Sequence, residues 1–232
     1  MNLAGFVPLS LCDYPGRVAA VVFTQGCNFR CPFCHNGHLL SLVPDPATRV
    51  DEERVLAVLA ERKNRLGGVV VSGGEPTAQT DLPHFLRRLK ALGLAVKLDT
   101  NGSRPNVLHA LLAERLLDYI AMDIKAPWDK YATLAGVACD VAAVQASMEL
   151  IAASGVPHLF RTTRVDPLLT ASDYTGLKTQ IPKASPHVWQ PFRAAFSRDP
   201  ALRPASAINA RAPAQSESPF SGKVAVDSLP PL

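Results

Sequence analysis

Three cysteines lie close together early in the sequence and offer metal-binding chemistry. Cys27, Cys31 and Cys34 follow the spacing C-x3-C-x2-C, which supplies three thiolates from eight residues. The irons of a cubane [4Fe–4S] cluster normally each take one cysteine. No fourth cysteine lies nearby, because Cys12 precedes this segment and Cys139 is far along the chain. One iron would therefore be open to a substrate or cofactor, whereas a structural site is normally closed.

The spacing, with Phe33 directly before the last cysteine, resembles that of the radical S-adenosylmethionine (SAM) enzymes. The resemblance implies that the open iron chelates the amino and carboxylate groups of SAM. It also implies that an electron from the cluster cleaves SAM to a 5′-deoxyadenosyl radical, which abstracts a hydrogen atom. The alternative is a structural zinc site made from the three cysteines and His35. Zinc sites usually pair a C-x2-C with a distant second half, so the spacing favours the cluster.

A second motif, Gly73-Gly74-Glu75-Pro76, follows the apolar run 69–71, about 40 residues after the cysteines. Two glycines allow a backbone to approach a ligand that a side chain would block. Glu75 offers a carboxylate to a cation such as an ammonium group. Alone, the motif is also typical of a plain strand-to-helix turn. After the cysteine motif it resembles the radical SAM segment that binds the SAM amino group.

The apolar runs that precede these motifs predict buried strands, and amphipathic segments alternate with them. Such alternation indicates a parallel sheet with right-handed crossovers. The predicted strands are 18–23, 69–71, 94–98, 119–124, 157–163 and 187–190, and the predicted helices are 51–65, 82–92, 105–117, 141–153 and 172–180. Residues 1–17 are predicted as a lead-in and a turn. Because six strands are too few for a closed eight-stranded barrel, we expect an α/β fold with a partial (βα)6 barrel.

Polar residues gather where the predicted strands end, which is where barrel enzymes place their active sites. Each of them alone could be an exposed strand terminus, but their concurrence at one edge predicts a site. The candidates are the three cysteines, Glu75, Asp99, Asp123, Lys125, Arg161 and Gln190.

Composition indicates one folded domain followed by a different segment. The chain has 232 residues, of which 47% are hydrophobic and 19% charged, enough for a sizeable core. Residues 197–232 lose the apolar periodicity, and Pro, Ser and Ala make up 19 of these 36 residues. We therefore expect a domain over residues 1–196 and an irregular tail over residues 197–232.

Charge and cysteine content indicate the class of protein and its location. The net charge of +4 comes from scattered Lys and Arg residues without a basic block, so we expect no nucleic-acid partner. Five cysteines, three of them clustered, form a poor disulfide framework. The sequence has no signal-peptide core at its start and no apolar run near 18 residues. We expect a cytoplasmic protein without a membrane segment.

Further motifs narrow the resemblance to the activases of glycyl radical enzymes, and most closely to the activating protein of anaerobic ribonucleoside-triphosphate reductase. The similarity covers about residues 5–196. The matching motifs are Ser10-Leu-x-Asp13-Tyr14-Pro15-Gly16, Thr24-Gln25-Gly26-Cys27-Asn28, Cys34-His35-Asn36, Gly73-Gly74-Glu75-Pro76, Asp99-Thr100-Asn101-Gly102, Asp123-Ile124-Lys125 and Gln190-Pro191-Phe192-Arg193.

This resemblance implies a role for each matching residue. The three cysteines would bind the cluster, and in related activases Asp99 and Asp123 help to form a monovalent-cation site near SAM. The residues that would contact SAM are Phe33 at the adenine, Gly73, Gly74 and Glu75 at the amino group, Asp123 and Lys125 at the ribose and carboxylate, with Arg161 assisting. Gln190 belongs to the Gln-x-Phe-Arg segment of the family near the last strand.

The resemblance also implies partners. The activated protein would be anaerobic ribonucleoside-triphosphate reductase. No cysteine lies between residues 35 and 72, so the ferredoxin-like insert of some activases is missing and an external flavodoxin or ferredoxin would supply the electron. Two departures concern substrate docking: Val165-Asp166-Pro167-Leu168 stands where activases often have Val-Pro-Gly, and residues 197–232 carry no predicted closing helix.

Two other functions fit parts of the sequence. One is a radical SAM enzyme that acts on a small molecule, such as a deazapurine-forming enzyme. The other is a non-enzymatic metal-binding module, against which the Gly-Gly-Glu-Pro motif and the acids at the strand ends argue.

Overall fold

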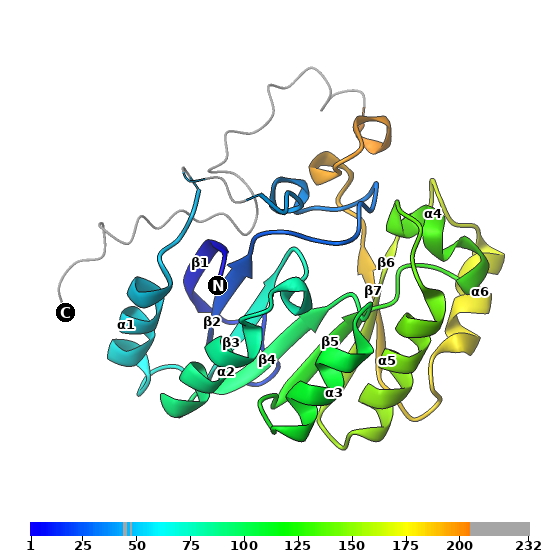
Figure 1. Cartoon of the computed structure of the whole chain (residues 1–232). Coiled ribbons are helices and arrows are strands. Elements are labelled where there is room, and N and C mark those ends of the chain that lie inside the picture. The colour runs from blue at the N-terminus through cyan, green and yellow to red at the C-terminus, as the bar shows by residue number, and fades with distance from the viewer. Residues whose placement is uncertain (44–45, 47, 205–232) are drawn as a thin grey trace.

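The apolar runs of the sequence form the strands of one sheet. In the computed structural model, which describes residues 1–43, 46 and 48–204, the strands lie side by side in chain order from β1 to β7 (Figure 1). Their bounds are β1 Leu3–Ser10, β2 Ala19–Thr24, β3 Gly68–Gly73, β4 Ala95–Thr100, β5 Tyr119–Asp123, β6 His158–Arg164 and β7 His187–Pro191. Each neighbouring pair from β2 to β7 is parallel. The six predicted parallel strands are confirmed.

The first strand was not predicted, and here the expectation of a lead-in and a turn over residues 1–17 is wrong. β1 pairs antiparallel with β2, with Phe6 opposite Val22. Gly5 and Pro8 interrupt its apolar pattern, and the register shifts between Val7 and Ser10. Both residue types are tolerated at the edge of a sheet, where β1 lies, because one side of an edge strand needs no ladder hydrogen bonds.

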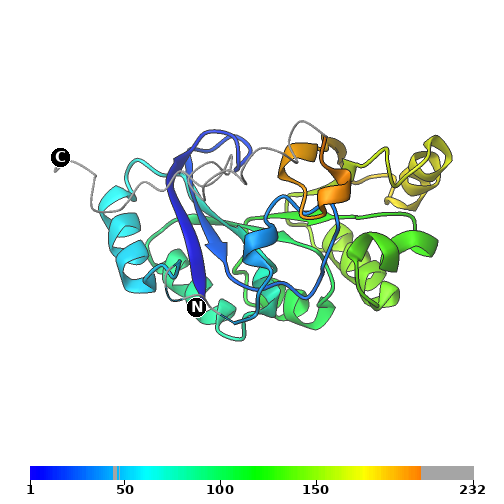
Figure 2. The same ribbon diagram turned by 90° about the horizontal axis from the view of Figure 1, so that it is seen from above.

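Helices connect the parallel strands, and the α-helices between β2 and β6 lie along one face of the sheet (Figure 2). The α-helices are α1 Glu52–Arg62, α2 Leu82–Ala91, α3 Pro105–Ala113, α4 Tyr131–Ala135, α5 Val141–Ala153 and α6 Ala171–Gln180. The 3-10 helices are η1 Gly37–Leu39, η2 Pro76–Ala78, η3 Trp128–Lys130, η4 Ala194–Phe196 and η5 Pro200–Leu202. The predicted bounds of α5 are confirmed, whereas α4 was not predicted because five residues are too few to show a helical period.

Side-chain alternation along the strands divides the core into two clusters. Ala20 and Val22 face the helix layer and belong to the larger cluster, while Ala19, Val21 and Phe23 belong to a smaller one on the opposite face. All six residues of β2 are buried, as expected for a parallel strand covered on both faces.

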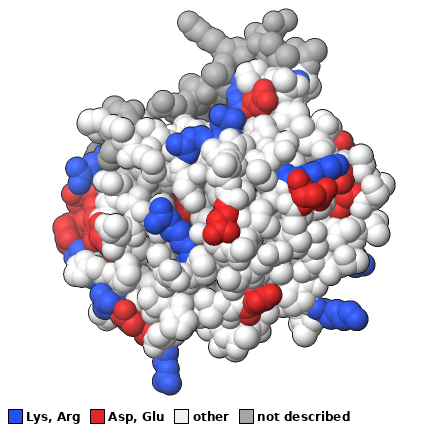
Figure 3. All heavy atoms as spheres, turned by 45° about the vertical axis from the view of Figure 1, so that its right-hand side comes forward, with Lys and Arg blue, Asp and Glu red and all other residues white. Residues whose placement is uncertain are grey.

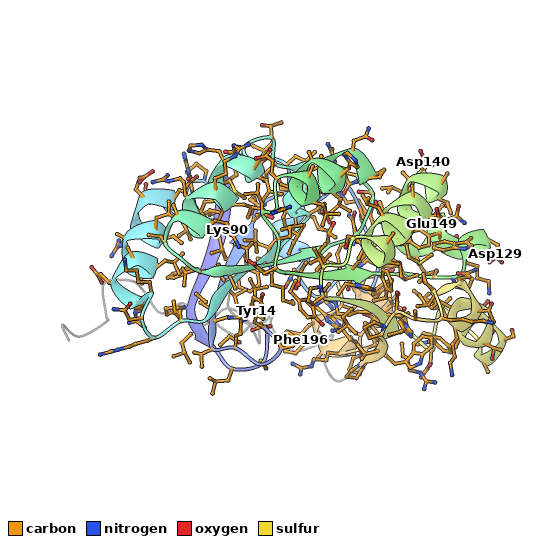
Figure 4. The ribbon with its side chains drawn as sticks, turned by 90° about the horizontal axis from the view of Figure 1, so that it is seen from below. Tyr14, Lys90, Asp129, Asp140, Glu149 and Phe196 are labelled. Atoms are coloured by element: carbon orange, nitrogen blue, oxygen red, sulfur yellow. The ribbon has the colours of Figure 1, made fainter. Side chains whose placement is uncertain are left out.

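The smaller cluster includes a residue from the turn between β1 and β2. Tyr14 is 4% exposed and packs near Tyr119, with ring centroids 5.9 Å apart. It lies on the opposite side of the sheet from Asp140 and Glu149, which mark α5 (Figure 4). The turn therefore folds back over the face of the sheet that the helices leave uncovered.

The surface carries charges of both signs. On the face shown in Figure 3, Lys and Arg side chains are scattered among Asp and Glu and separated by uncharged surface. Within the part of the chain that the structure describes, no helix is both long and apolar enough to span a bilayer. Of the predicted tail, residues 197–204 are described and the rest lies outside the described residues.

Candidate functional site

A cavity of about 340 Å³ opens at the carboxyl ends of the parallel strands. Parallel strands present these ends at one edge, so side chains from distant parts of the sequence meet there. The structure brings all of the predicted site residues to the wall of this cavity: Cys27, Cys31, Phe33, Cys34, Gly73, Gly74, Glu75, Asp99, Asp123, Lys125, Arg161 and Gln190.

The cysteine loop follows β2 and is held mainly through its backbone. Gly26 N–H donates to Leu39 O at 2.7 Å, and Cys27 N–H donates to Leu40 O at 3.3 Å. Arg30 N–H donates to Ala135 O, at the end of α4, at 2.8 Å. The thiols thus face the cavity while backbone groups of η1 and α4 support the loop from behind.

Burial sets the protonation of the three thiols. It raises the pKa of Cys27 to about 12 and that of Cys31 to about 11, and it raises the pKa of Cys34 as well. The thiols are therefore protonated at neutral pH until a metal displaces the protons, because the thiolate is the form that binds metal.

The geometry fits a cluster better than a single ion. Nowhere in residues 1–43, 46 and 48–204 do three His, Cys, Asp or Glu side chains converge closely enough to hold one metal ion. A cubane cluster does not require that convergence, because each cysteine binds a different iron. His35, the fourth ligand of the zinc alternative, accepts a hydrogen bond from Arg193 N–H at 3.2 Å and stacks on Phe192 at 5.8 Å.

The Gly-Gly-Glu-Pro segment leaves β3 against the backbone of the cysteine loop. A Cβ on Gly73 would lie 2.3 Å from Thr24 N, and one on Gly74 would lie 2.1 Å from Gly26 O. Glu75 N–H donates to Gly26 O at 2.8 Å. The two glycines were predicted to admit a ligand, but the group that requires their missing side chains here is this neighbouring backbone.

The Glu75 carboxylate lies inside the protein, where it is 1% exposed. One oxygen accepts hydrogen bonds from the Thr77 amide and hydroxyl and from the Thr100 hydroxyl, the last at 2.7 Å. The other oxygen accepts from Asn101 N–H at 2.6 Å. Burial raises the pKa of this carboxyl, and these donors offset part of that effect. Glu75 therefore ties the ends of β3 and β4 together.

Five charged side chains form a continuous ion-pair chain across β4, β5 and β6. Arg161 lies at its centre, with Nη1 3.2 Å from Asp99 Oδ2 and Nε 2.8 Å from Asp123 Oδ1. Lys97 Nζ contacts the second oxygen of Asp99, and Lys125 Nζ donates to Asp123 Oδ2 at 3.0 Å. Three cations and two anions alternate, so the chain has a formal charge of +1.

The ion pairs overcome the effect of burial on these groups. Burial alone would raise the pKa of Asp123, but Arg161 and Lys125 outweigh it and hold the pKa below its ordinary value. The Asp99 pKa is lowered by Arg161 and Lys97 in the same way. The resemblance implied a monovalent cation near the two carboxylates, and here the Arg161 guanidinium lies between them.

Several residues of this edge were not predicted. Lys97 is 3% exposed, and its position two residues before Asp99 puts both side chains on one face of β4. That spacing is a sequence signal that could have identified it. The roles of Thr77, Thr100 and Asn101 depend on their contacts with Glu75, which no sequence pattern specifies.

The comparisons with known proteins agree with this geometry. The model of the radical SAM superfamily matches residues 21–170. The chain is 38% identical over 135 residues to a protein of Methanocaldococcus jannaschii named "Putative glycyl-radical enzyme activating enzyme MJ1227", covering 56% of this chain and 52% of that protein. It is 30% identical over 132 residues to the 7-carboxy-7-deazaguanine synthase of Methanopyrus kandleri, covering 49% of this chain and 52% of the synthase. The chain thus spans about half the length of these relatives.

A solved structure shares the fold. The structure of Streptococcus suis SuiB bound to S-adenosylmethionine matches with a TM-score of 0.56 at 15% sequence identity, covering 72% of this chain and 39% of SuiB. The family match covers most of the sheet, and three thiols facing one cavity fit a cluster with an open iron. The chain therefore belongs to the radical SAM superfamily, whose cofactors are a [4Fe–4S] cluster and S-adenosylmethionine.

Proposed function

We propose that this protein generates a glycyl radical on a large partner enzyme, and that the partner is anaerobic ribonucleoside-triphosphate reductase. The similarity to the Methanocaldococcus jannaschii protein supports the activase class. The motifs over residues 5–196 that resemble the reductase activating protein support the choice of partner.

The open sheet is the structural observation that carries this proposal. The strand order runs from β1 to β7, and the described strands include no pairing between these two edges. The cavity is at the small end of the range for ligand sites, so cluster and SAM leave little room for a second enclosed molecule. A glycine loop of a partner protein could instead enter from the open side.

The cluster, when bound by Cys27, Cys31 and Cys34, supplies the electron that cleaves SAM. We assign Phe33 and Gln190 to the walls of the SAM site. The segment from Gly73 to Glu75 would take the amino group, with Glu75 acting as a positioning residue because protein donors already occupy its oxygens.

The ion-pair chain would bind the acidic end of SAM. Its formal charge of +1 attracts a carboxylate, and Lys125 faces the cavity from the end of the chain. Asp123 orients Lys125, and Arg161 holds Asp99 and Asp123 apart in a fixed geometry. The electron would come from a separate flavodoxin or ferredoxin, since neither Cys12 nor Cys139 lines the cavity.

The test uses reduced protein with SAM and the cognate reductase. The protein alone should cleave SAM slowly. With the reductase it should yield 5′-deoxyadenosine and a doublet EPR signal from a glycine radical on the partner. A partner whose radical glycine is replaced by alanine should lose the doublet, while the cluster of this protein stays unchanged. If the reductase gains no radical and a small molecule drives efficient SAM turnover, the activase proposal fails.

A radical SAM enzyme acting on a small molecule is the second candidate. The similarity to a 7-carboxy-7-deazaguanine synthase favours it. The two candidates differ in what stimulates SAM cleavage: a protein in the first case and a small purine-like compound in the second.

A further inference from the structure

The first residues after β7 and η4 contact the cysteine loop from the side away from the cavity. Arg198 N–H donates to Cys34 O at 2.9 Å, and Asp199 N–H donates to Pro32 O at 2.9 Å. The Ser197 hydroxyl donates to Pro32 O at 2.9 Å as well. We call residues 197–199 the C-terminal strap. None of them lines the cavity, whereas Cys31, Phe33, Cys34 and His35 do.

The strap is itself fixed in place. Ser197 is fully buried, and its carbonyl oxygen accepts a hydrogen bond from Arg203 Nε at 2.8 Å. The Arg198 side chain reaches back to the loop, where its Nε donates to Cys31 O at 3.3 Å. The strap therefore occupies the carbonyls of Cys31, Pro32 and Cys34.

These contacts determine where two amide groups of the loop point. In a trans peptide unit the C=O of one residue and the N–H of the next point in opposite directions. Because Pro32 O and Cys34 O point at the strap, Phe33 N–H and His35 N–H point away from it, and the strap does not line the cavity that the thiols line. Neither amide has a protein acceptor among the described residues.

We propose that the strap holds the Phe33 and His35 amides as hydrogen-bond donors to the sulfur atoms of the bound cluster and thereby sets its reduction potential. Hydrogen bonds to cluster sulfurs are one of the factors that fix the potential. Reduction adds negative charge to the cluster, and donors bind a more negative acceptor more strongly. The strap therefore favours the reduced state, which is the state that delivers the electron to SAM. This inference depends on the cluster alone and not on the identity of the activated partner.

The test removes the strap donors to Pro32 without changing the loop itself. Asp199 has a φ of −77°, which a proline can adopt, so Asp199→Pro deletes the N–H without straining φ at residue 199. The test variant combines it with Ser197→Ala, which deletes the hydroxyl donor. The matched control is Ser197→Ala with Asp199→Ala, which also loses the Asp199 side chain but keeps the backbone donor.

The potential of the reconstituted cluster is read by EPR during a reductive titration. We expect the ratio of reduced to oxidised cluster at a fixed potential to fall about tenfold in the proline variant, equal to 59 mV for one electron. The alanine control, which keeps the backbone donor to Pro32 O, should stay closer to the wild-type value than the proline variant does. Equal potentials in the two variants would overturn the proposal.

If the proline variant does not assemble a cluster, a second measurement tests the proposal. Hydrogen–deuterium exchange of the peptide spanning residues 31–36 is then compared in the cluster-free proteins. Faster exchange in the proline variant than in the alanine control supports the strap as the element that fixes these amides. Equal exchange contradicts it.

Discussion

The two ends of the cavity are built in different ways. At the cysteine end the protein contacts the loop through backbone carbonyls and amides, and three thiols are left facing the cavity. At the charged end, where β4, β5 and β6 finish, Lys97, Asp99, Arg161, Asp123 and Lys125 bind one another through their side chains. The cysteine end is thus prepared for ligands that it still lacks, whereas the charged end is already neutralised except for one positive charge.

The difference teaches how each end can tolerate change. A thiol that binds iron has no substitute within the loop, so loss of one ligand removes a bond that nothing else replaces. In the ion-pair chain each carboxylate binds two cations. Loss of one side chain therefore removes only part of the interactions at this end. Mutations at the cysteine end should therefore act on cluster assembly, and mutations at the charged end should act on SAM affinity and stability.

The largest effect is expected at the cysteine end. Replacing any one of Cys27, Cys31 or Cys34 by alanine should abolish cluster-dependent activity and lower the iron content of anaerobically reconstituted protein. Cys12→Ala and Cys139→Ala are the controls, because these thiols lie outside the cavity. A variant lacking one of these three cysteines that still bound about four irons and cleaved SAM would contradict the claim that no other group can replace a cluster ligand.

Glu75 joins the ends of β3 and β4, so its loss should reduce stability. Glu75→Ala leaves the buried donors of Thr77, Thr100 and Asn101 without their acceptor, at a cost of roughly 1–3 kcal/mol for each unsatisfied group. We expect the free energy of unfolding to fall by at least about 3 kcal/mol, measured by urea denaturation of the cluster-free protein. Glu75→Gln retains one acceptor oxygen, so its free energy of unfolding should lie between those of the wild type and Glu75→Ala. An unchanged midpoint in Glu75→Ala would contradict this role.

Lys125 tests the charged end. Lys125→Met should leave iron content intact and weaken SAM binding, since a charge-assisted hydrogen bond contributes roughly 1.5–3 kcal/mol, or about tenfold or more in affinity. Lys90→Met is the matched control, because Lys90 forms a 2.8 Å ion pair with Asp118 away from the cavity. Equilibrium binding of SAM to the reconstituted protein is the measurement. Equal affinities in the two variants would show that SAM lies elsewhere.

The smallest effect is a dependence of stability on pH. The pKa of Asp123 is lowered in the folded state, from an ordinary value of 3.8, so the unfolded chain binds more protons near that pH. The stability that this carboxylate contributes is present above pH 3.8 and is lost as the pH falls toward the folded pKa. The difference in unfolding free energy between wild type and Asp123→Asn should shrink from pH 7 to pH 3.

The sequence predicted most of the frame of this site, because apolar runs mark buried parallel strands and polar residues mark where they end. Asp99, Asp123 and Arg161 could be placed at one edge from that rule alone. β1 was not predicted because Gly5 and Pro8 interrupt the apolar pattern of this edge strand. The hydrogen bonds of Glu75 to Thr100 and Asn101 and those of the C-terminal strap could not be predicted, since they join segments far apart in the sequence that carry no residue signature.

The most direct test of a shared cavity for cluster and SAM is EPR spectroscopy of the reduced, anaerobically reconstituted protein with and without SAM. The protein should hold about four irons and four sulfides per chain, the content of one cubane cluster. Adding SAM should change the EPR signal of the wild type, and the same change in Lys125→Met should require about tenfold more SAM. A wild-type signal that saturating SAM leaves unchanged, or stoichiometric zinc with no bound iron, would contradict the account.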